Sequence, residues 1–104
     1  MKNSDIFVRL SDKLRSALEA RAEEIGLNVP ELFRFLFLID LRYPEKFKPD
    51  KGYGVTEGSL TKIRVDGSTR KRIAEQAKMH GLTRSRYLRS IAIRELEKYT
   101  DFVE

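Results

Sequence analysis

The chain has 104 residues, no cysteine, a single histidine and a formal net charge of +5. This length allows one modest domain, and the composition excludes disulfides, thiolate metal sites and a histidine-based metal cluster. No apolar signal core follows Met1, and no apolar run approaches the length of a membrane span. We therefore expect a cytoplasmic protein without membrane contact, which for a viral protein means the cytoplasm of the host cell.

The positive charge lies in the second half of the chain. Residues 1–50 hold nine Lys or Arg and nine Asp or Glu, whereas residues 51–104 hold twelve against seven. A basic half favours an anionic partner, most often nucleic acid, although a basic surface can also serve solubility alone.

Residues 6–10 predict a short β-strand, because side chains of two kinds alternate along them. One face carries the aliphatic residues Ile6, Val8 and Leu10. The other face carries Asp5, Phe7 and Arg9. Ser11 is a suitable N-cap for a helix after the strand, and Gly26 is placed to end that helix.

A second helix begins with the capping-box pattern of Asn28 and Glu31 and ends at Tyr43-Pro44. Residues 32–41 are apolar on almost every side of this helix. We therefore expect either burial on several sides or contact with another copy of the chain in a homodimer or higher oligomer. The candidate residues for that contact are Phe33, Phe35, Phe37 and Leu38.

Residues 44–59 are rich in Lys, Pro, Gly and Asp without a sustained period, which predicts a linker. Residues 60–65 then predict a second short strand, since their side chains again alternate. One of its faces carries Thr61, Ile63 and Val65. The other carries Leu60, Lys62 and Arg64.

Two more helices follow the second strand. Asp66 or Ser68 can cap the first of them, and Gly81 is placed to end it. Its inward face is predicted to carry Ile73, Ala77 and Met79. Thr83 is a suitable N-cap for the last helix, in which apolar residues recur at helical spacing as far as Tyr99.

The two halves of the chain align without a gap when each residue of the first half is placed on the residue 55 positions later, as Arg9 is on Arg64. We call this constant shift the repeat offset. The identities are Arg9 with Arg64, Arg15 with Arg70, Ala22 with Ala77, Gly26 with Gly81, Leu27 with Leu82, Arg34 with Arg89 and Leu41 with Leu96. The sequence therefore predicts two β-α-α repeats, at residues 1–43 and 60–104, joined by the linker at 44–59. Units of this size rarely fold alone, so we expect the two repeats to share one core.

Residues 81–89 (GLTRSRYLR) resemble the corner between the two helices of the ribbon-helix-helix family, which includes the Arc and methionine repressors. A short alternating strand lies upstream of such a corner in both repeats. The resemblance implies a mainly α fold with a short β-ribbon, in which the two repeats form an intramolecular pseudo-dimer. Tandem copies of this kind occur among small regulators of archaeal viruses and plasmids, so it also implies a transcription regulator such as a repressor.

In this family the two strands pair antiparallel, and the ribbon enters the major groove of double-stranded DNA. The resemblance therefore implies a groove-facing set of Asp5, Phe7, Arg9, Leu60, Lys62 and Arg64. Arg9 and Arg64 match a base-contacting position of the family, and each side chain can bind guanine in a bidentate manner. Phe7 can contact thymine methyl groups. The alternatives are solvated charges for the arginines and an ordinary exposed aromatic for Phe7.

The resemblance also implies a phosphate clamp at the start of the second helix of each repeat, where backbone N–H groups are exposed. The implied residues are Asn28 and Val29 in repeat one and Thr83, Arg84 and Ser85 in repeat two, with Arg86 and Arg70 beside them. Pro30 lacks the N–H group that Ser85 has, and Glu31 stands where Arg86 stands. We therefore expect repeat two to hold phosphate more strongly.

These features predict a sequence-preferring transcription regulator that binds double-stranded DNA, needs no cofactor and prefers unlike half-sites. A weakly specific architectural DNA-coating protein, an antitoxin-type regulator and a protein-interaction module that has lost DNA binding are the alternatives. We expect no enzyme, because the chain has no cysteine, a single histidine (His80) and no Gly-rich phosphate loop.

Overall fold

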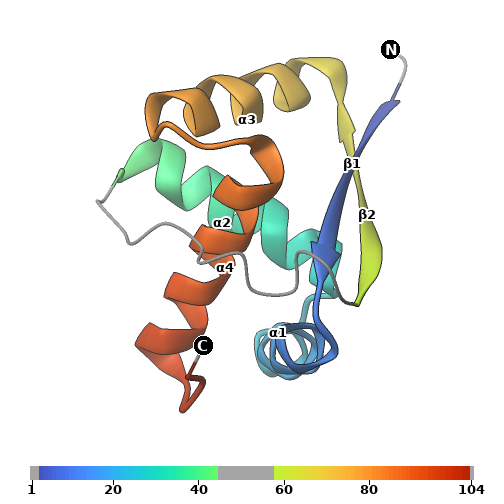
Figure 1. Ribbon diagram of the computed structural model, residues 1–104, viewed down its shortest axis with the longest axis vertical. Helices are drawn as coiled ribbons and strands as arrows, with labels where there is room; N and C mark the ends of the chain where they lie inside the picture. Colours follow the sequence, from blue (N-terminus) through green and yellow to red (C-terminus); the bar gives the residue numbers. More distant parts are fainter. Residues whose placement is uncertain (1–2, 45–57, 104) are drawn as a thin grey trace.

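The computed structural model describes residues 3–44 and 58–103, and it has a mainly helical fold with one two-stranded antiparallel sheet (Figure 1). In chain order the elements are β1 (Asn3–Leu10), α1 (Asp12–Glu24), α2 (Val29–Arg42), β2 (Ser59–Asp66), α3 (Gly67–Met79) and α4 (Arg84–Tyr99). The four helices of these ranges lie on the same side of the sheet. Most of the predicted linker lies outside the described residues, and Ser59, its last predicted residue, belongs to β2.

The two strands pair along their whole length and are longer than predicted. Ile6 lies opposite Ile63, and Val8 lies opposite Thr61. The side chains on this inner face are buried, as the alternation predicted: Ile6, Val8, Leu10, Thr61, Ile63 and Val65. Because a two-stranded ribbon is marginal in water by itself, these residues stabilise it by packing on the helices.

The predicted helix starts are confirmed. Ser11, Asn28 and Thr83 each accept a hydrogen bond from the backbone N–H group three residues later. The Asn28 N–H group in turn donates to Glu31 Oε1 at 2.9 Å, which completes the capping box. Of the two candidates for the start of α3, Asp66 is the cap and Ser68 is not.

Both glycine corners have the same geometry. Gly26 has a φ of 80° and Gly81 a φ of 73°, in the left-handed region that favours glycine. The N–H group of the next residue binds the carbonyl oxygen five residues earlier, from Leu27 to Ala22 at 2.8 Å and from Leu82 to Ala77 at 2.9 Å. α1 and α3 thus each end in a Schellman motif, so the chain turns towards α2 and towards α4 with the same local geometry.

One hydrophobic core draws on all six elements. Within it α2 packs on β2, and α4 packs on β1, so each strand contacts the second helix from the other half of the chain. No helix in the described ranges combines the length and the apolarity needed to cross a membrane.

The prediction that Met79 faces inward is wrong, and the apolar residues of α2 are buried on one side only. Met79 is 64% exposed, because it is the last residue of α3 and lies beyond the last buried position, Ala77. On α2 the helical period divides the apolar residues between two sides. Phe33 and Phe37 are buried in the core of the single chain, whereas Phe35 and Leu38 are exposed.

A buried carboxylate joins α2 to the second half of the chain. Asp40 of α2 is 0% exposed, and one of its oxygens accepts a hydrogen bond from the Tyr87 hydroxyl at 2.5 Å. Gln76 donates to the same oxygen at 3.3 Å, and Arg94 donates to the other at 3.3 Å. Burial and the contact with Asp40 raise the pKa of Tyr87, so its hydroxyl remains a donor at neutral pH.

The Tyr87→Phe variant should reveal the contribution of this cluster. It removes the hydroxyl group and keeps the ring, so we expect the free energy of unfolding to fall by about 1.5–3 kcal/mol, as for other hydrogen bonds to charged groups. Tyr99→Phe is the matched control, because Tyr99 is exposed on the same helix. Its effect is expected to stay within about 0.5 kcal/mol. Equal effects of the two substitutions in denaturant titrations would contradict this account.

A second prediction concerns pH. The N–H group and the side chain of Thr69 and the charge of Arg72 lower the pKa of Asp66, which accepts the Thr69 N–H at 2.6 Å. Because the folded-state pKa is depressed, the ionised cap stabilises the fold above the unfolded-state pKa, and this contribution is lost as the pH falls. Relative to Asp66→Asn, the wild type should therefore lose stability below about pH 3.9. A stability difference that does not change with pH would contradict the prediction.

Candidate nucleic-acid interface

Six predicted side chains share the face of the ribbon that is turned away from the helices, which we call the outer ribbon face. The strand register arranges them as three cross-strand pairs: Asp5 with Arg64, Phe7 with Lys62, and Arg9 with Leu60. Phe7 is 50% exposed and Leu60 is 54% exposed. Lys62 and Arg64 are exposed, while Asp5 and Arg9 are half-buried. The structure therefore brings the whole predicted set to one accessible surface.

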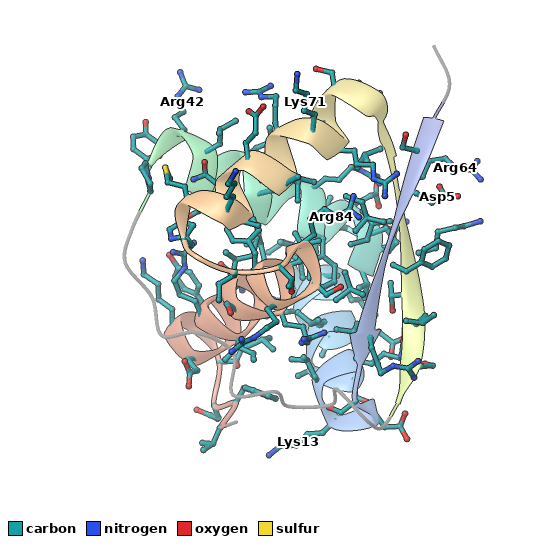
Figure 2. All side chains as sticks on the ribbon, turned by 45° about the horizontal axis from the view of Figure 1, so that its top comes forward. Asp5, Lys13, Arg42, Arg64, Lys71 and Arg84 are labelled. Carbon is teal, nitrogen blue, oxygen red and sulfur yellow. The ribbon has the colours of Figure 1, made fainter. Side chains whose placement is uncertain are left out.

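The charges on the outer ribbon face are unevenly compensated. Arg64 Nε lies 3.6 Å from Asp5 Oδ1, and Figure 2 shows the two side chains next to each other beside the sheet. Arg9 Nη1 donates to the Gly58 carbonyl oxygen at 3.1 Å. Within the described residues, the Lys62 ammonium group, in the middle pair, has no ion-pair partner. The charge of Arg64 is therefore offset by a carboxylate, whereas no carboxylate in the described ranges offsets the charge of Lys62.

The start of α4 is held against the centre of the ribbon. Ser85 Oγ donates to the Phe7 carbonyl oxygen at 3.2 Å. The Ser85 hydroxyl group is thus used within the chain, and its backbone N–H group is the part that can face a phosphate. Thr83 is exposed, Arg84 is half-buried and Arg86 is exposed beside them.

The start of α2 has a different surface. The Asn28 side chain is engaged in the capping box, and Val29 is 8% exposed. Pro30 occupies the place of Ser85, so α2 lacks both the hydroxyl group and the N–H group found there. The starts of α2 and α4 therefore differ in their hydrogen-bonding groups as well as in their charge.

The basic residues of α3 lie at the same end of the molecule as the Asp66 cap. Arg70 is half-buried, and Lys71 and Arg72 are exposed in the first turns of the helix. They extend positive charge from the ribbon along α3.

Two arginines whose side chains form hydrogen bonds between the helices and the ribbon were not predicted from the sequence. Arg34 Nη1 of α2 donates to the Arg64 carbonyl oxygen at 3.0 Å. Arg89 Nη1 of α4 donates to the Arg9 carbonyl oxygen at 3.4 Å. Both contacts join a second helix to the strand of the other half, at positions related by the repeat offset. The presence of arginine at both of these equivalent positions is the feature of the sequence that could have indicated the shared contact.

The exposed apolar residues of α2 lie near a surface hollow. Phe35 and Ile39 line it together with Ile25 and Tyr99, and Leu38 is exposed on the same helix. Of the four residues predicted to contact another copy, only Phe35 and Leu38 are therefore accessible. In the described part of the chain, no three His, Cys, Asp or Glu side chains are grouped to hold a metal ion.

Comparison with known protein families, curated proteins and solved structures finds no match for this chain. Its function therefore has to be inferred from its own geometry.

The helix-to-ribbon contact can be tested with Arg34→Met, which keeps the apolar stem of the side chain and removes the donor. We expect the free energy of unfolding to fall by about 1 kcal/mol, the usual net contribution of one hydrogen bond. We also expect faster hydrogen exchange of the β2 amides. Arg42→Met, in the exposed last turn of the same helix, is the control. If both variants exchange at the wild-type rate, the contact does not hold the ribbon.

Proposed function

We propose that this protein is a transcription regulator of the ribbon-helix-helix type that inserts its outer ribbon face into the major groove of double-stranded DNA. The observation that carries the proposal is the two-stranded ribbon with three cationic side chains on its exposed face and all described helices on its other face. The major groove, about 12 Å wide, admits a two-stranded β-ribbon. A binding role of this kind needs neither catalysis nor a cofactor.

The strand register supports an intramolecular pseudo-dimer of residues 1–43 and 60–104. Positions related by the repeat offset are equivalent between the proposed repeats, and Phe7 and Lys62, which face each other, are such a pair. A twofold axis between the halves would pass through this middle pair. The same offset relates the first residues of α1 and α3, Asp12 and Gly67, and also their last residues, Glu24 and Met79.

A second pair of crosswise contacts supports the same symmetry. Asp40 of α2 contacts Gln76 of α3, and Glu95 of α4 accepts a hydrogen bond from Arg21 of α1 at 2.9 Å. The repeat offset relates Asp40 to Glu95 and Arg21 to Gln76. Each half thus places an acidic residue of its second helix against the first helix of the other half.

On DNA the ribbon residues and the helix starts would have separate roles. Arg9 and Arg64 would bind guanine in a bidentate manner, Lys62 would bind guanine or phosphate, and Phe7 would contact thymine methyl groups. The backbone at Thr83, Arg84 and Ser85, with Arg86, would anchor phosphate on one side. On the other side Glu31 already binds the Asn28 N–H group, so the backbone at Val29 would be left for a weaker phosphate contact. The Ser85 contact to the ribbon supports this arrangement, because it fixes the start of α4 beside the base-reading residues.

We also propose contact with another copy of the chain through Phe35 and Leu38 of α2. Both residues are exposed, and they belong to a helix whose other apolar side is already buried. Such contact would leave the ribbons of both copies free for DNA.

The test begins with selection of bound duplexes from a random-sequence pool and measurement of affinity for the winners. Alanine at Arg9, Lys62 and Arg64 should weaken binding to the selected duplex by about 2–6 kcal/mol, from two bidentate contacts of about 1–3 kcal/mol each. Binding to random duplexes should fall much less at the same salt concentration.

A charge-matched control separates base contact from net charge. Alanine at Arg42, Lys78 and Lys98 removes the same charge from the last turns of α2, α3 and α4, which lie away from the ribbon (Figure 1). If both triple variants lose the same amount of affinity for the selected duplex, the outer ribbon face has no specific role in binding. Equal wild-type affinity for selected and random duplexes would instead favour the architectural DNA-coating protein.

A further inference from the structure

We propose that the ribbon prefers a DNA site whose two half-sites differ in one defined way, because its two ends carry different cross-strand pairs. This inference depends on the proposed function. At one end Arg64 is paired with a carboxylate, Asp5, and at the other end Arg9 is paired with a hydrocarbon, Leu60. The two arginines occupy equivalent positions, so the difference between the ends lies in their neighbours.

The Asp5 end presents a carboxylate and a guanidinium group together. Arg64 Nε is 3.6 Å from Asp5 Oδ1, and the side chains are 61% and 33% exposed. Asp5 Oδ1 is shielded from solvent and accepts no hydrogen bond within the described residues. Because Oδ1 is shielded, the acceptor left for a base on this partly exposed side chain is Oδ2, in the same carboxylate that Arg64 contacts.

This pairing restricts the bases that the Asp5 end can accept. In the major groove cytosine offers an amino donor alone, adenine offers an amino donor beside the N7 acceptor, and thymine and guanine offer acceptor oxygens at the corresponding place. An ionised carboxylate accepts a hydrogen bond from the amino group and repels the oxygens. The Asp5 end therefore fits a guanine bound by Arg64 next to a cytosine bound by Asp5. We call this half-site A.

The Leu60 end has the opposite preference. Leu60 is 54% exposed, carries no polar group and lies opposite Arg9. A hydrocarbon beside the arginine can contact a thymine methyl group and would leave a cytosine amino group without a protein partner. This end therefore fits a guanine bound by Arg9 next to a thymine, which we call half-site B.

The equivalence of positions 5 and 60 allows each end to be converted into the other by one substitution. Leu60→Asp gives both ends an Asp–Arg pair, and Asp5→Leu gives both ends a Leu–Arg pair. The experiment compares three duplexes made from the half-sites selected by the wild type: the unlike pair AB and the palindromes AA and BB. Thermal unfolding of each variant establishes that it is folded, and each variant tests the inference separately.

We expect the wild type to prefer AB, Leu60→Asp to prefer AA and Asp5→Leu to prefer BB, each by about tenfold for the one exchanged contact. Selection of a palindrome by the wild type, or retention of the AB preference by a folded variant, would overturn the inference and leave the proposed function intact. Equal binding to all three duplexes would overturn base reading at the ribbon ends. Absence of DNA binding would overturn the inference together with the proposed function.

Discussion

The antiparallel pairing of β1 with β2 is the contact on which the rest of the structure depends. A two-stranded ribbon is marginal in water, and a strand with two short helices has too little apolar surface to fold alone. Pairing the strands puts the inner-face residues of both halves into one core, so the ribbon and the helices stabilise each other. The outer ribbon face remains accessible because the described helices all cover the other side.

The helix starts and the inward-facing strand residues are predictable from the sequence because both are local patterns. Ser11 and Thr83 cap their helices for reasons contained within four residues. Strand register is not local. Alternation assigns Asp5 and Arg64 to the outer face, but only the pairing of two distant strands decides that they are neighbours. The candidate site was therefore predictable as a set of residues and not as an arrangement of pairs.

Helix α2 shows a second limit of sequence reasoning. Its apolar residues surround the helix, so the sequence does not reveal which side faces the core. The structure buries Phe33 and Phe37 and also buries Asp40, the one acidic residue in the last turns of the helix. That choice depends on Tyr87, Gln76 and Arg94, which lie in α3 and α4 and supply the hydrogen-bond donors that a buried carboxylate needs.

Both strands of the ribbon belong to the same chain, and this has a consequence for how the molecule behaves at low abundance. When a ribbon forms between two separate chains, folding is a bimolecular reaction, and dilution unfolds the protein. Here folding of the ribbon is unimolecular, so the stability of a single copy does not depend on concentration. A cell holding only a few copies would still contain complete ribbons, and each residue on the outer face could change without forcing the same change at its equivalent position.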